Sequence, residues 1–300
     1  MGAIITDLRE AFRKGNVAIR LIYINVGLFV VTTLIEVLLN LFNRTAAGFL
    51  EVLALPASVE RWMEQPWSLL TYMFMHAGFI HILFNMLWLY WFGTLFLYFF
   101  SSKHLRGLYL IGGLFGGLLY MLAYNVFPFF EEHLMEATLV GASASVLAIV
   151  SAIAYREPNY PIRLFLFGTI RLKYLAWIVF GTDLLLMTSS NAGGHIAHLG
   201  GALGGLCFAM ALKRGTDLTA WVNKVIDTMG GWLTTGWSFK RKPKMKVHYH
   251  KGGRQQDYDY NAHKKEQSDE IDRILDKLKK SGYNSLTTEE KKSLFDASKR

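Results

Sequence analysis

Long apolar stretches recur along this chain, and they limit its fold more than any other feature. Each is about 20 residues long, which at 1.5 Å per helical residue matches the hydrocarbon thickness of a bilayer. Ordinary core helices are shorter. We therefore predict an all-α polytopic membrane protein, a bundle of six transmembrane helices with a small helical C-terminal tail. The predicted spans are Leu21–Phe42, His81–Phe100, Leu105–Phe127, Thr138–Tyr155, Leu172–Met187 and Ile196–Leu212.

Composition removes several other classes. Apolar side chains make up 52% of the 300 residues, which excludes intrinsic disorder for most of the chain. Cys207 is the only cysteine, so it cannot form a disulfide within the chain. The first apolar stretch, from Leu21, is too long for a cleavable signal and lacks a small-residue cleavage site, so we expect no such signal.

The formal net charge of +9 is concentrated in the C-terminal part. Residues 1–212 carry 12 Lys and Arg against 11 Asp and Glu, whereas residues 213–300 carry 20 against 12. Basic residues also occupy the N-terminus and the second and fourth loops, while the third loop has Glu131, Glu132 and Glu136 and no Lys or Arg. By the positive-inside rule both termini are cytoplasmic. The charge thus indicates topology, and we expect no nucleic-acid partner.

We divide the chain into a membrane domain (1–212), a juxtamembrane helix with a basic flexible linker (213–265) and a helical hairpin (266–300). Apolar residues at helical spacing between Leu218 and Trp232 predict an interfacial helix. The Lys and Arg cluster at 240–246 either contacts anionic lipid or is simply solvated. In the hairpin, Ser268 is the predicted cap of the first helix, which stops at Gly282, and Thr287–Glu290 is a capping box for the second. The partner of this tail is unknown.

Four polar residues fall inside predicted spans at a common depth. His81 and Asn85 begin the second span, and Ser143 and His198 lie about five residues into the fourth and sixth. All three spans run from the outside inward, which places these groups roughly 5–10 Å below the outer face. Polar groups are costly in hydrocarbon, so their coincidence at one layer predicts a functional site.

The chemistry available to this layer is nucleophilic catalysis. A serine hydroxyl needs an adjacent base, most often histidine, and Ser143 and His198 form such a pair if their spans touch. Small residues favour that contact, because the fourth span opens at Gly141 and the sixth carries Gly201 and Gly205 four residues apart. An oxyanion would lie near the N-terminal end of the fourth span, where backbone N–H groups and the helix dipole favour negative charge.

The motifs resemble those of the rhomboid intramembrane serine proteases. They are His81-Ile-Leu-Phe-Asn85, Gly141-Ala-Ser143-Ala and Ala197-His198-Leu-Gly-Gly201, in family order, with Ser143 and His198 55 residues apart. The resemblance implies a Ser143–His198 dyad without a catalytic Asp, and oxyanion stabilisation by His81, Asn85 and the Ser143 backbone. Ala144 replaces the glycine that commonly follows the serine. The helical hairpin resembles, more weakly, the tails of rhomboids of the Bacteroidota type.

Other readings of the polar residues are weaker. His195 and His198, one turn apart, suggest zinc, but no third ligand is convincing in the sequence, so we expect neither a metal nor another cofactor. Asp183 and Glu36 are lone carboxylates; we expect Asp183 to bond a neighbouring helix and Glu36 to snorkel or pack inward. Ser145 is two residues from Ser143 and is expected to pack.

We predict a serine endopeptidase of the bacterial inner membrane that cleaves membrane-spanning proteins near the outer face. One alternative is a rhomboid-like pseudoprotease that binds membrane proteins without cutting them, which Ala144 would favour. The other is a small polytopic transporter, although the sequence contains no internal repeat.

Overall fold

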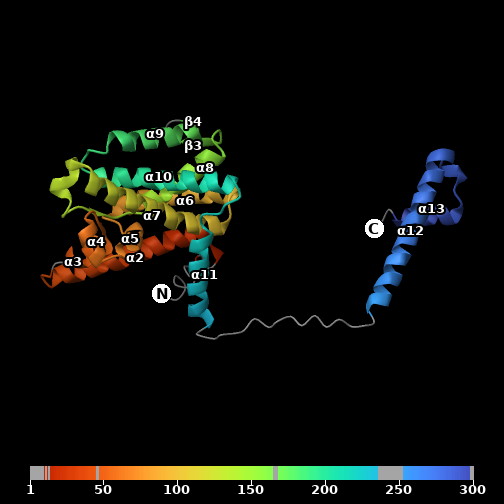
Figure 1. Ribbon diagram of the computed structural model, residues 1–300, viewed down its shortest axis with the longest axis horizontal. Coiled ribbons are helices and arrows are strands. Elements are labelled where there is room, and N and C mark those ends of the chain that lie inside the picture. The colour runs from red at the N-terminus through yellow and green to blue at the C-terminus, as the bar shows by residue number, and fades with distance from the viewer. Residues whose placement is uncertain are drawn as a thin grey trace. The chain divides into compact units, whose positions relative to one another are not determined.

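The computed structural model describes residues 10, 12, 14–44, 47–164, 168–235 and 253–297. They fall into two units, Met1–Gly236 and Trp237–Arg300. The first unit is a bundle of six main helices (Figure 1). These are α2 (Val17–Leu41), α6 (Phe79–Phe99), α7 (Ser102–Val126), α8 (Ser143–Arg156), α9 (Leu172–Leu185) and α10 (Ala192–Lys213). The other elements of this unit are α3 (Ala47–Leu53), β1 (Leu55–Pro56), α4 (Val59–Glu64), α5 (Ser68–Thr71), η1 (Tyr72–Phe74), η2 (Pro128–His133), β2 (Thr138–Leu139), the hairpin β3 (Pro161–Leu164) and β4 (Gly168–Arg171), and the 16-residue helix α11 (Ala220–Thr235).

Four helices of the described part, α2, α6, α7 and α10, are long and apolar enough to cross a membrane. Helices α8 and α9 have 14 residues each, which corresponds to about 21 Å of rise, less than the ~30 Å of a hydrocarbon core. All six follow the order of the predicted spans. The predicted fold class, an all-α polytopic membrane bundle, is confirmed.

Glycine packing builds the centre of this bundle. Helices α7, α8 and α10 pack against one another, with α9 along one flank and α2 along the other (Figure 1). A methyl group added at Gly201 of α10 would lie 2.0 Å from the carbonyl oxygen of Ala144, and one at Gly205 would lie 2.1 Å from that of Ala148. These glycines let α10 touch the backbone of α8, as small-residue faces do in membranes.

The prediction that the fourth span starts at Thr138 is wrong. The chain there is extended: β2 pairs antiparallel with β1, and Leu139 faces Leu55. Gly141 then adopts φ +133°, a conformation that favours glycine, and its N–H donates to the carbonyl of Tyr72 at 2.9 Å. Helix α8 starts only at Ser143, so Gly141 lies in the approach to the helix and not on its packing face.

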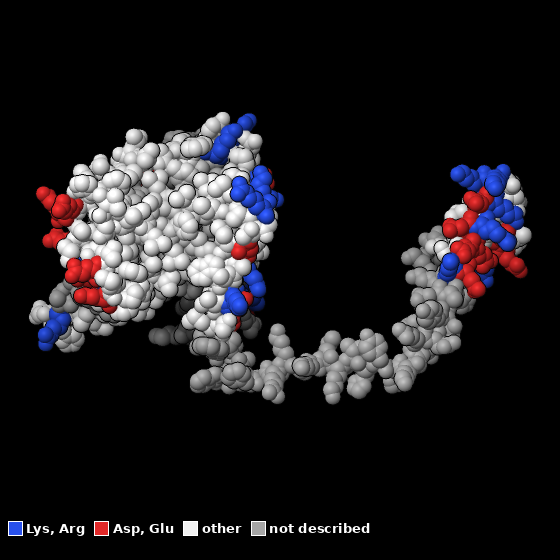
Figure 2. Space-filling model, in the orientation of Figure 1, with Lys and Arg blue, Asp and Glu red and all other residues white. Residues whose placement is uncertain are grey.

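Acidic residues predominate at one end of the bundle and basic residues at the other (Figure 2), with Arg61 of α4 at the acidic end and Asp227 beside Lys103 and Arg106 at the basic end. The acidic end carries Glu residues of α4 and of the segment between α7 and β2, namely Glu60, Glu64, Glu131, Glu132 and Glu136. The basic end carries Lys103 and Arg106 at the start of α7, and Arg156 and Lys213 at the ends of α8 and α10. The N-terminal end of α8 therefore faces the acidic end.

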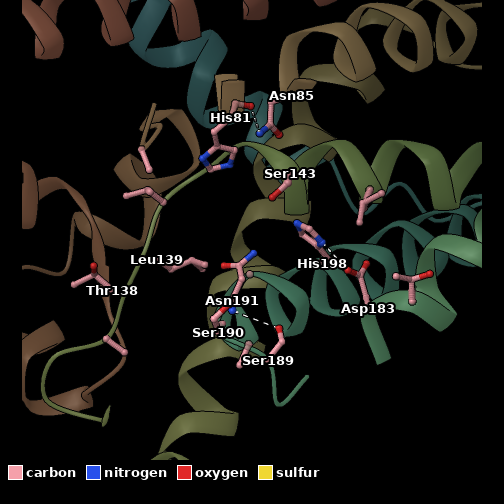
Figure 3. Close-up of a pocket in the computed structure, with 18 of the residues that line it drawn as sticks. His81, Asn85, Thr138, Leu139, Ser143, Asp183, Ser189, Ser190, Asn191 and His198 are labelled. Atoms are coloured by element: carbon pink, nitrogen blue, oxygen red, sulfur yellow. Dashed lines mark hydrogen bonds and ion pairs between the residues drawn. The ribbon is translucent and has the colours of Figure 1, made fainter. Parts of the chain in front are cut away.

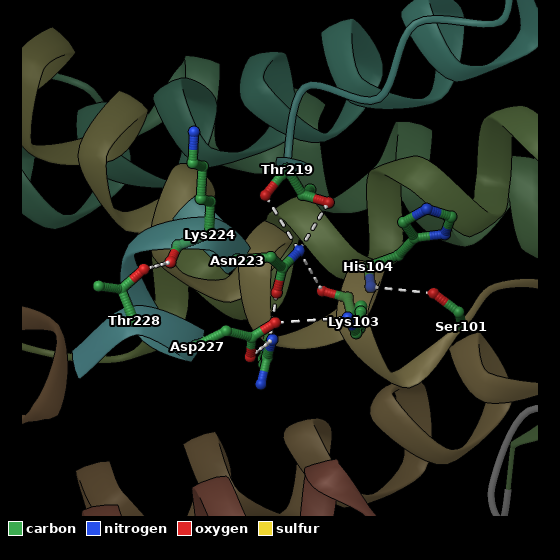
Figure 4. Close-up of polar contacts among 9 residues, drawn as sticks. Ser101, Lys103, His104, Thr219, Asn223, Lys224, Asp227 and Thr228 are labelled. Atoms are coloured by element: carbon green, nitrogen blue, oxygen red, sulfur yellow. Dashed lines mark hydrogen bonds and ion pairs between the residues drawn. The ribbon is translucent and has the colours of Figure 1, made fainter. Parts of the chain in front are cut away.

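Helix α11 docks on the start of α7 through polar side chains (Figure 4). Buried Asn223 donates its amide to the Lys103 carbonyl at 3.0 Å and accepts from Arg106 Nε at 2.6 Å. Asp227 accepts hydrogen bonds from Arg106 and from Lys103. Trp221 of the same helix is 59% exposed.

The second unit is a helical hairpin. Helix α12 (Gly253–Ser281) ends at Gly282, whose φ is +74°, and η3 (Tyr283–Ser285) and α13 (Thr288–Ala297) follow. The predicted capping box is present: the Thr287 N–H donates to Glu290 Oε2 at 2.8 Å, and the Glu290 N–H donates to Thr287 Oγ1 at 3.2 Å.

One prediction for this tail is wrong, and another concerns residues outside the described part of the chain. The first helix begins at Gly253 and not at Ser268, so the predicted linker is wrong from Gly253 onward. Charged and amide side chains, which the sequence analysis assigned to a linker, are also good helix formers. The cluster at 240–246 lies outside the described residues.

Candidate active site

A cavity of about 1500 Å³ opens between α6, α8, α9 and α10 (Figure 3). Its lining includes the four residues singled out from the sequence, which are His81, Asn85, Ser143 and His198. Apolar side chains of α6 and α9, among them Trp88 and Ile178, form facing parts of the same wall. The cavity therefore has both polar groups and apolar side chains of α6 and α9 in its wall.

Ser143 is the first residue of α8, not the fifth of a span. The N–H groups of the first helical turn have no partner within their own helix, and the positive end of the helix dipole lies there as well. The turn at Gly141 and Ala142 presents this end to the cavity. The nucleophile candidate thus stands beside its own backbone donors.

His198 lies in α10, directly across from Ser143. Gly201, one turn further along α10, touches the backbone of Ala144, so the two side chains belong to adjoining turns of helices in contact. Figure 3 shows the His198 ring between Ser143 and Asp183. Among the described residues no hydrogen bond joins the Ser143 hydroxyl to His198. Catalytic hydrogen bonds are often long in an unliganded site, and rotation about the Cα–Cβ bond re-aims a serine hydroxyl.

His81 and Asn85 extend from α6 on the other side of Ser143. A methyl group at Gly141 would lie 2.9 Å from His81 Nε2 and 3.7 Å from Ser143 Oγ, so the His81 ring lies close to the backbone just before the nucleophile candidate. Asn85 donates one amide hydrogen to the His81 carbonyl at 2.9 Å. An amide carries two hydrogens, which leaves one for the cavity.

Ala144 does not narrow the cavity. A methyl group at Gly116 of α7 would lie 2.5 Å from the Ala144 side chain, which places that side chain in the contact between α7 and α8. Ala144 is 1% exposed and is not among the cavity-lining residues. The extra methyl is accommodated because the facing residue is glycine.

Asp183 joins the site in a way that the sequence analysis did not foresee. As expected, it bonds a neighbouring helix: its Oδ1 lies 2.9 Å from His198 Nδ1 and 2.8 Å from His195 Nδ1, both on α10. The contact with His198, however, brings a carboxylate to the predicted base. The signal available was a single carboxylate in the fifth span, before two histidines one turn apart. Sequence analysis also missed the loop Ser189–Asn191, which lines the cavity.

The sequence analysis found no third zinc ligand beside His195 and His198, but Asp183 could be one. The ligand atoms of the three residues lie within 4.8 Å of one another. The separations fit hydrogen bonds better. Zinc with ligands at about 2.0–2.2 Å in a tetrahedron holds neighbouring ligand atoms about 3.4 Å apart. Here both nitrogens lie within 2.9 Å of one oxygen.

The remaining polar candidates lie away from the cavity. Ser145 is buried, and its Oγ faces Gly113 of α7, as a packing residue would. Glu36 is exposed on α2, so the inward packing considered for it is not observed.

Comparisons with known proteins identify the family that the membrane part of the chain matches. Residues 63–215 match a family model described as "Rhomboid domain", and residues 255–300 match a family of unknown function. RHOMBOID-like protein 12, mitochondrial, of Arabidopsis thaliana is 31% identical over 144 residues, which is 45% of this chain and 43% of that protein. The chain therefore matches less than half the length of this relative.

Proposed function

This chain belongs to the rhomboid family, and from that premise we propose that it is an intramembrane serine endopeptidase with Ser143 as nucleophile and His198 as general base. The observation that carries the proposal is the placement of Ser143 at the start of α8, on the wall of one cavity with His198, His81 and Asn85. Rhomboids act on membrane proteins within the bilayer, and we infer that the substrates are membrane-spanning proteins.

The proposed reaction has two halves. Ser143 Oγ attacks a peptide carbonyl while His198 takes the hydroxyl proton and then delivers it to the departing amine. Water next attacks the acyl-enzyme and gives a proton to His198, which returns it to Ser143 Oγ as the acyl–oxygen bond breaks and the new carboxyl end is released. The backbone N–H of Ser143 and the side chains of His81 and Asn85 would stabilise the oxyanion of both tetrahedral intermediates.

Substrate access follows from the shape of the cavity. A transmembrane helix hides its carbonyls in its own hydrogen bonds, so a substrate segment must unwind locally before Ser143 can reach it. The polar cavity offers hydrogen-bonding partners to such a segment, and we infer that the segment enters between α6 and α9, whose apolar side chains line the cavity. Small residues crowd the approach to Ser143, which favours a small residue at the cleavage position.

We further propose that the basic end of this multi-pass membrane protein is cytoplasmic, in a bacterial inner membrane, and that cleavage occurs near the outer face. Segregation of charge along the bundle supports this orientation (Figure 2). Residues 1–212 would form the protease domain, with α11 as a juxtamembrane helix. The α12–α13 hairpin would be a docking or regulatory module.

A fluorophosphonate probe tests the assignment. The full-length protein in detergent or proteoliposomes should be labelled, and labelling should vanish in Ser143→Ala and His198→Ala. Ser190→Ala is the matched control, because Ser190 is a serine on the same cavity. Absence of labelling from a folded wild type would favour the pseudoprotease, and solute flux through proteoliposomes without labelling would favour the transporter.

Asn85→Ala tests the oxyanion role separately. Loss of one oxyanion donor should lower kcat by about 10²–10³-fold. Turnover of a fluorogenic transmembrane peptide in proteoliposomes measures it, and unchanged kinetics would remove Asn85 from this role.

A further inference from the structure

The proposed base has a carboxylate behind it. His198 Nδ1 lies 2.9 Å from Asp183 Oδ1, and the Asp183 side chain is 6% exposed. Asp183 comes from α9, whereas Ser143 and His198 come from α8 and α10, so three helices converge on this line of groups (Figure 3).

This contact bears on which nitrogen of His198 carries the proton. A carboxylate only accepts hydrogen bonds, so the nitrogen beside it must be the protonated one. Nδ1 then donates to Asp183, and Nε2, on the other side of the ring, is left as the acceptor toward Ser143. A neutral imidazole with the opposite tautomer would present an N–H to the serine and could not take its proton.

We propose that Asp183 is the positioning residue for His198: it holds the base in the Nδ1–H tautomer, fixes the plane of its ring and stabilises the imidazolium formed during each attack. The inference rests on the proposed function, and it extends the two-residue dyad to a Ser143–His198–Asp183 arrangement. In the Ser-His-Asp triads of serine proteases with other folds, the three residues have these same roles.

His195 supports this arrangement from behind. Its Nδ1 lies 2.8 Å from the same Asp183 Oδ1, and the two imidazole rings are almost perpendicular, at 84°. With two N–H donors on one oxygen, the carboxylate is oriented from two successive turns of α10. His195 does not line the cavity, so its effect on catalysis must pass through Asp183.

Kinetics of the Asp183→Asn protein test the proposal. Asparagine keeps the shape but turns an N–H toward the imidazole, so kcat should fall roughly 10²–10⁴-fold with KM changed less than about threefold. His195→Phe, which removes only the second donor, should lower kcat less, by roughly 3–10-fold. Glu60→Gln is the control, since Glu60 is an exposed carboxylate of the same protein that does not line the cavity, and its kcat should not change. Asp183→Asn turnover within threefold of wild type would overturn the proposal.

A second measurement does not depend on activity. ¹⁵N spectra of histidine-labelled protein in nanodiscs should show His198 protonated on Nδ1 in wild type and on Nε2 in Asp183→Asn. An Nε2–H tautomer in wild type overturns the positioning role even if the chain proves to be a pseudoprotease. Turnover lost with EDTA and restored by Zn²⁺ would instead assign Asp183, His195 and His198 to a metal, and would also overturn it. If no Ser143-dependent cleavage is found but the Nδ1–H tautomer is present, the proposed function is wrong. The contact by which Asp183 orients His198 would still stand.

Discussion

The centre and the periphery of the membrane bundle are held by different kinds of contact. Helices α7, α8 and α10 meet through glycines, with backbone nearly touching backbone. Helices α9 and α11 add polar side-chain contacts to their apolar ones, through Asp183 in one case and Asn223 with Asp227 in the other. On α9 the large apolar side chains mostly point outward: Trp177 is 74% and Leu185 82% exposed.

This difference divides the candidate site as well. Ser143 and His198 stand on the glycine-packed pair, where a shift of one helix requires the other to move. Asp183 stands on the loosely covered α9. Contact between backbones fixes distance, whereas a hydrogen bond between side chains fixes direction with less burial. In the proposed reaction, the backbone contact of α8 with α10 sets the distance between Ser143 and His198. The hydrogen bond from Asp183 sets the orientation of the His198 ring.

Gly201→Ala should have the largest effect. Its methyl group would lie 2.0 Å from a backbone oxygen, so α8 and α10 must separate. A displacement of about 1 Å at reacting groups can cost 10²-fold in rate, and overpacking typically costs about 1–3 kcal/mol of stability. Peptide turnover and thermal unfolding in detergent measure both. Gly181→Ala on α9 is the matched control, because a methyl group there meets nothing within 4 Å, and equal damage from both variants would erase the contrast.

Gly112→Ala should be rescued by a second change. Its methyl group would lie 2.4 Å from the Ala148 side chain and 3.2 Å from the Ser145 Cα. We expect a loss of about 1–3 kcal/mol for the single variant. Adding Ala148→Gly removes the nearer clash and should recover part of that loss, against a cost of about 1 kcal/mol for glycine in a helix. A double-mutant cycle of unfolding free energies measures the coupling, and strict additivity would show that the two helices do not share this space.

Asn223→Ala should loosen α11 and leave the centre intact. The change removes the partner of Arg106 Nε and of the Lys103 carbonyl, a loss of about 1–3 kcal/mol for α11 docking. Hydrogen exchange should rise in 220–235 and stay unchanged in α8 and α10. Lys224→Ala on the adjacent exposed position is the control. Faster exchange throughout the bundle would mean that α11 is part of the core.

Acid should produce the smallest effect, confined to α11. The hydrogen bond from Arg106, reinforced by Lys103, holds the pKa of Asp227 below its ordinary 3.8. Such a group stabilises the docked helix fully above 3.8, and this contribution is lost as the pH falls through the lowered pKa. The protection factors of the α11 amides, which correct for the pH dependence of intrinsic exchange, should therefore fall as the pH drops below 3.8, more weakly at high salt. Asp227→Asn should flatten that profile; an unchanged profile would exclude this ion pair as its cause.

The order of the helices and the contact of α8 with α10 follow from local patterns, which is why the sequence predicts them. Apolar length, charge alternation and small residues four apart each depend on a few neighbouring positions. The Thr287–Glu290 cap is likewise local, and it is present as predicted.

Non-local contacts explain what the sequence missed. Residues 138–142 are apolar enough for a span, but β2 pairs with Leu55–Pro56 far upstream, and that pairing delays α8 until Ser143. The meeting of Asp183 with His198 depends on how α9 rotates against α10, which no periodicity within α9 encodes. The polar composition near Gly253 is compatible with both a helix and a linker, which is why the sequence analysis missed the start of α12.

The fit of Ala144 against Gly116 has a consequence for how members of this family are sorted. The space beside the nucleophile depends on the side chains at two facing positions, 144 on α8 and 116 on α7. An alanine at one position fits when the other is glycine. A search pattern that demands glycine after the serine would discard this chain for a methyl group that points away from the cavity. Family members should therefore be compared by the residues at both positions, the one after the serine and the one that faces it on the neighbouring helix.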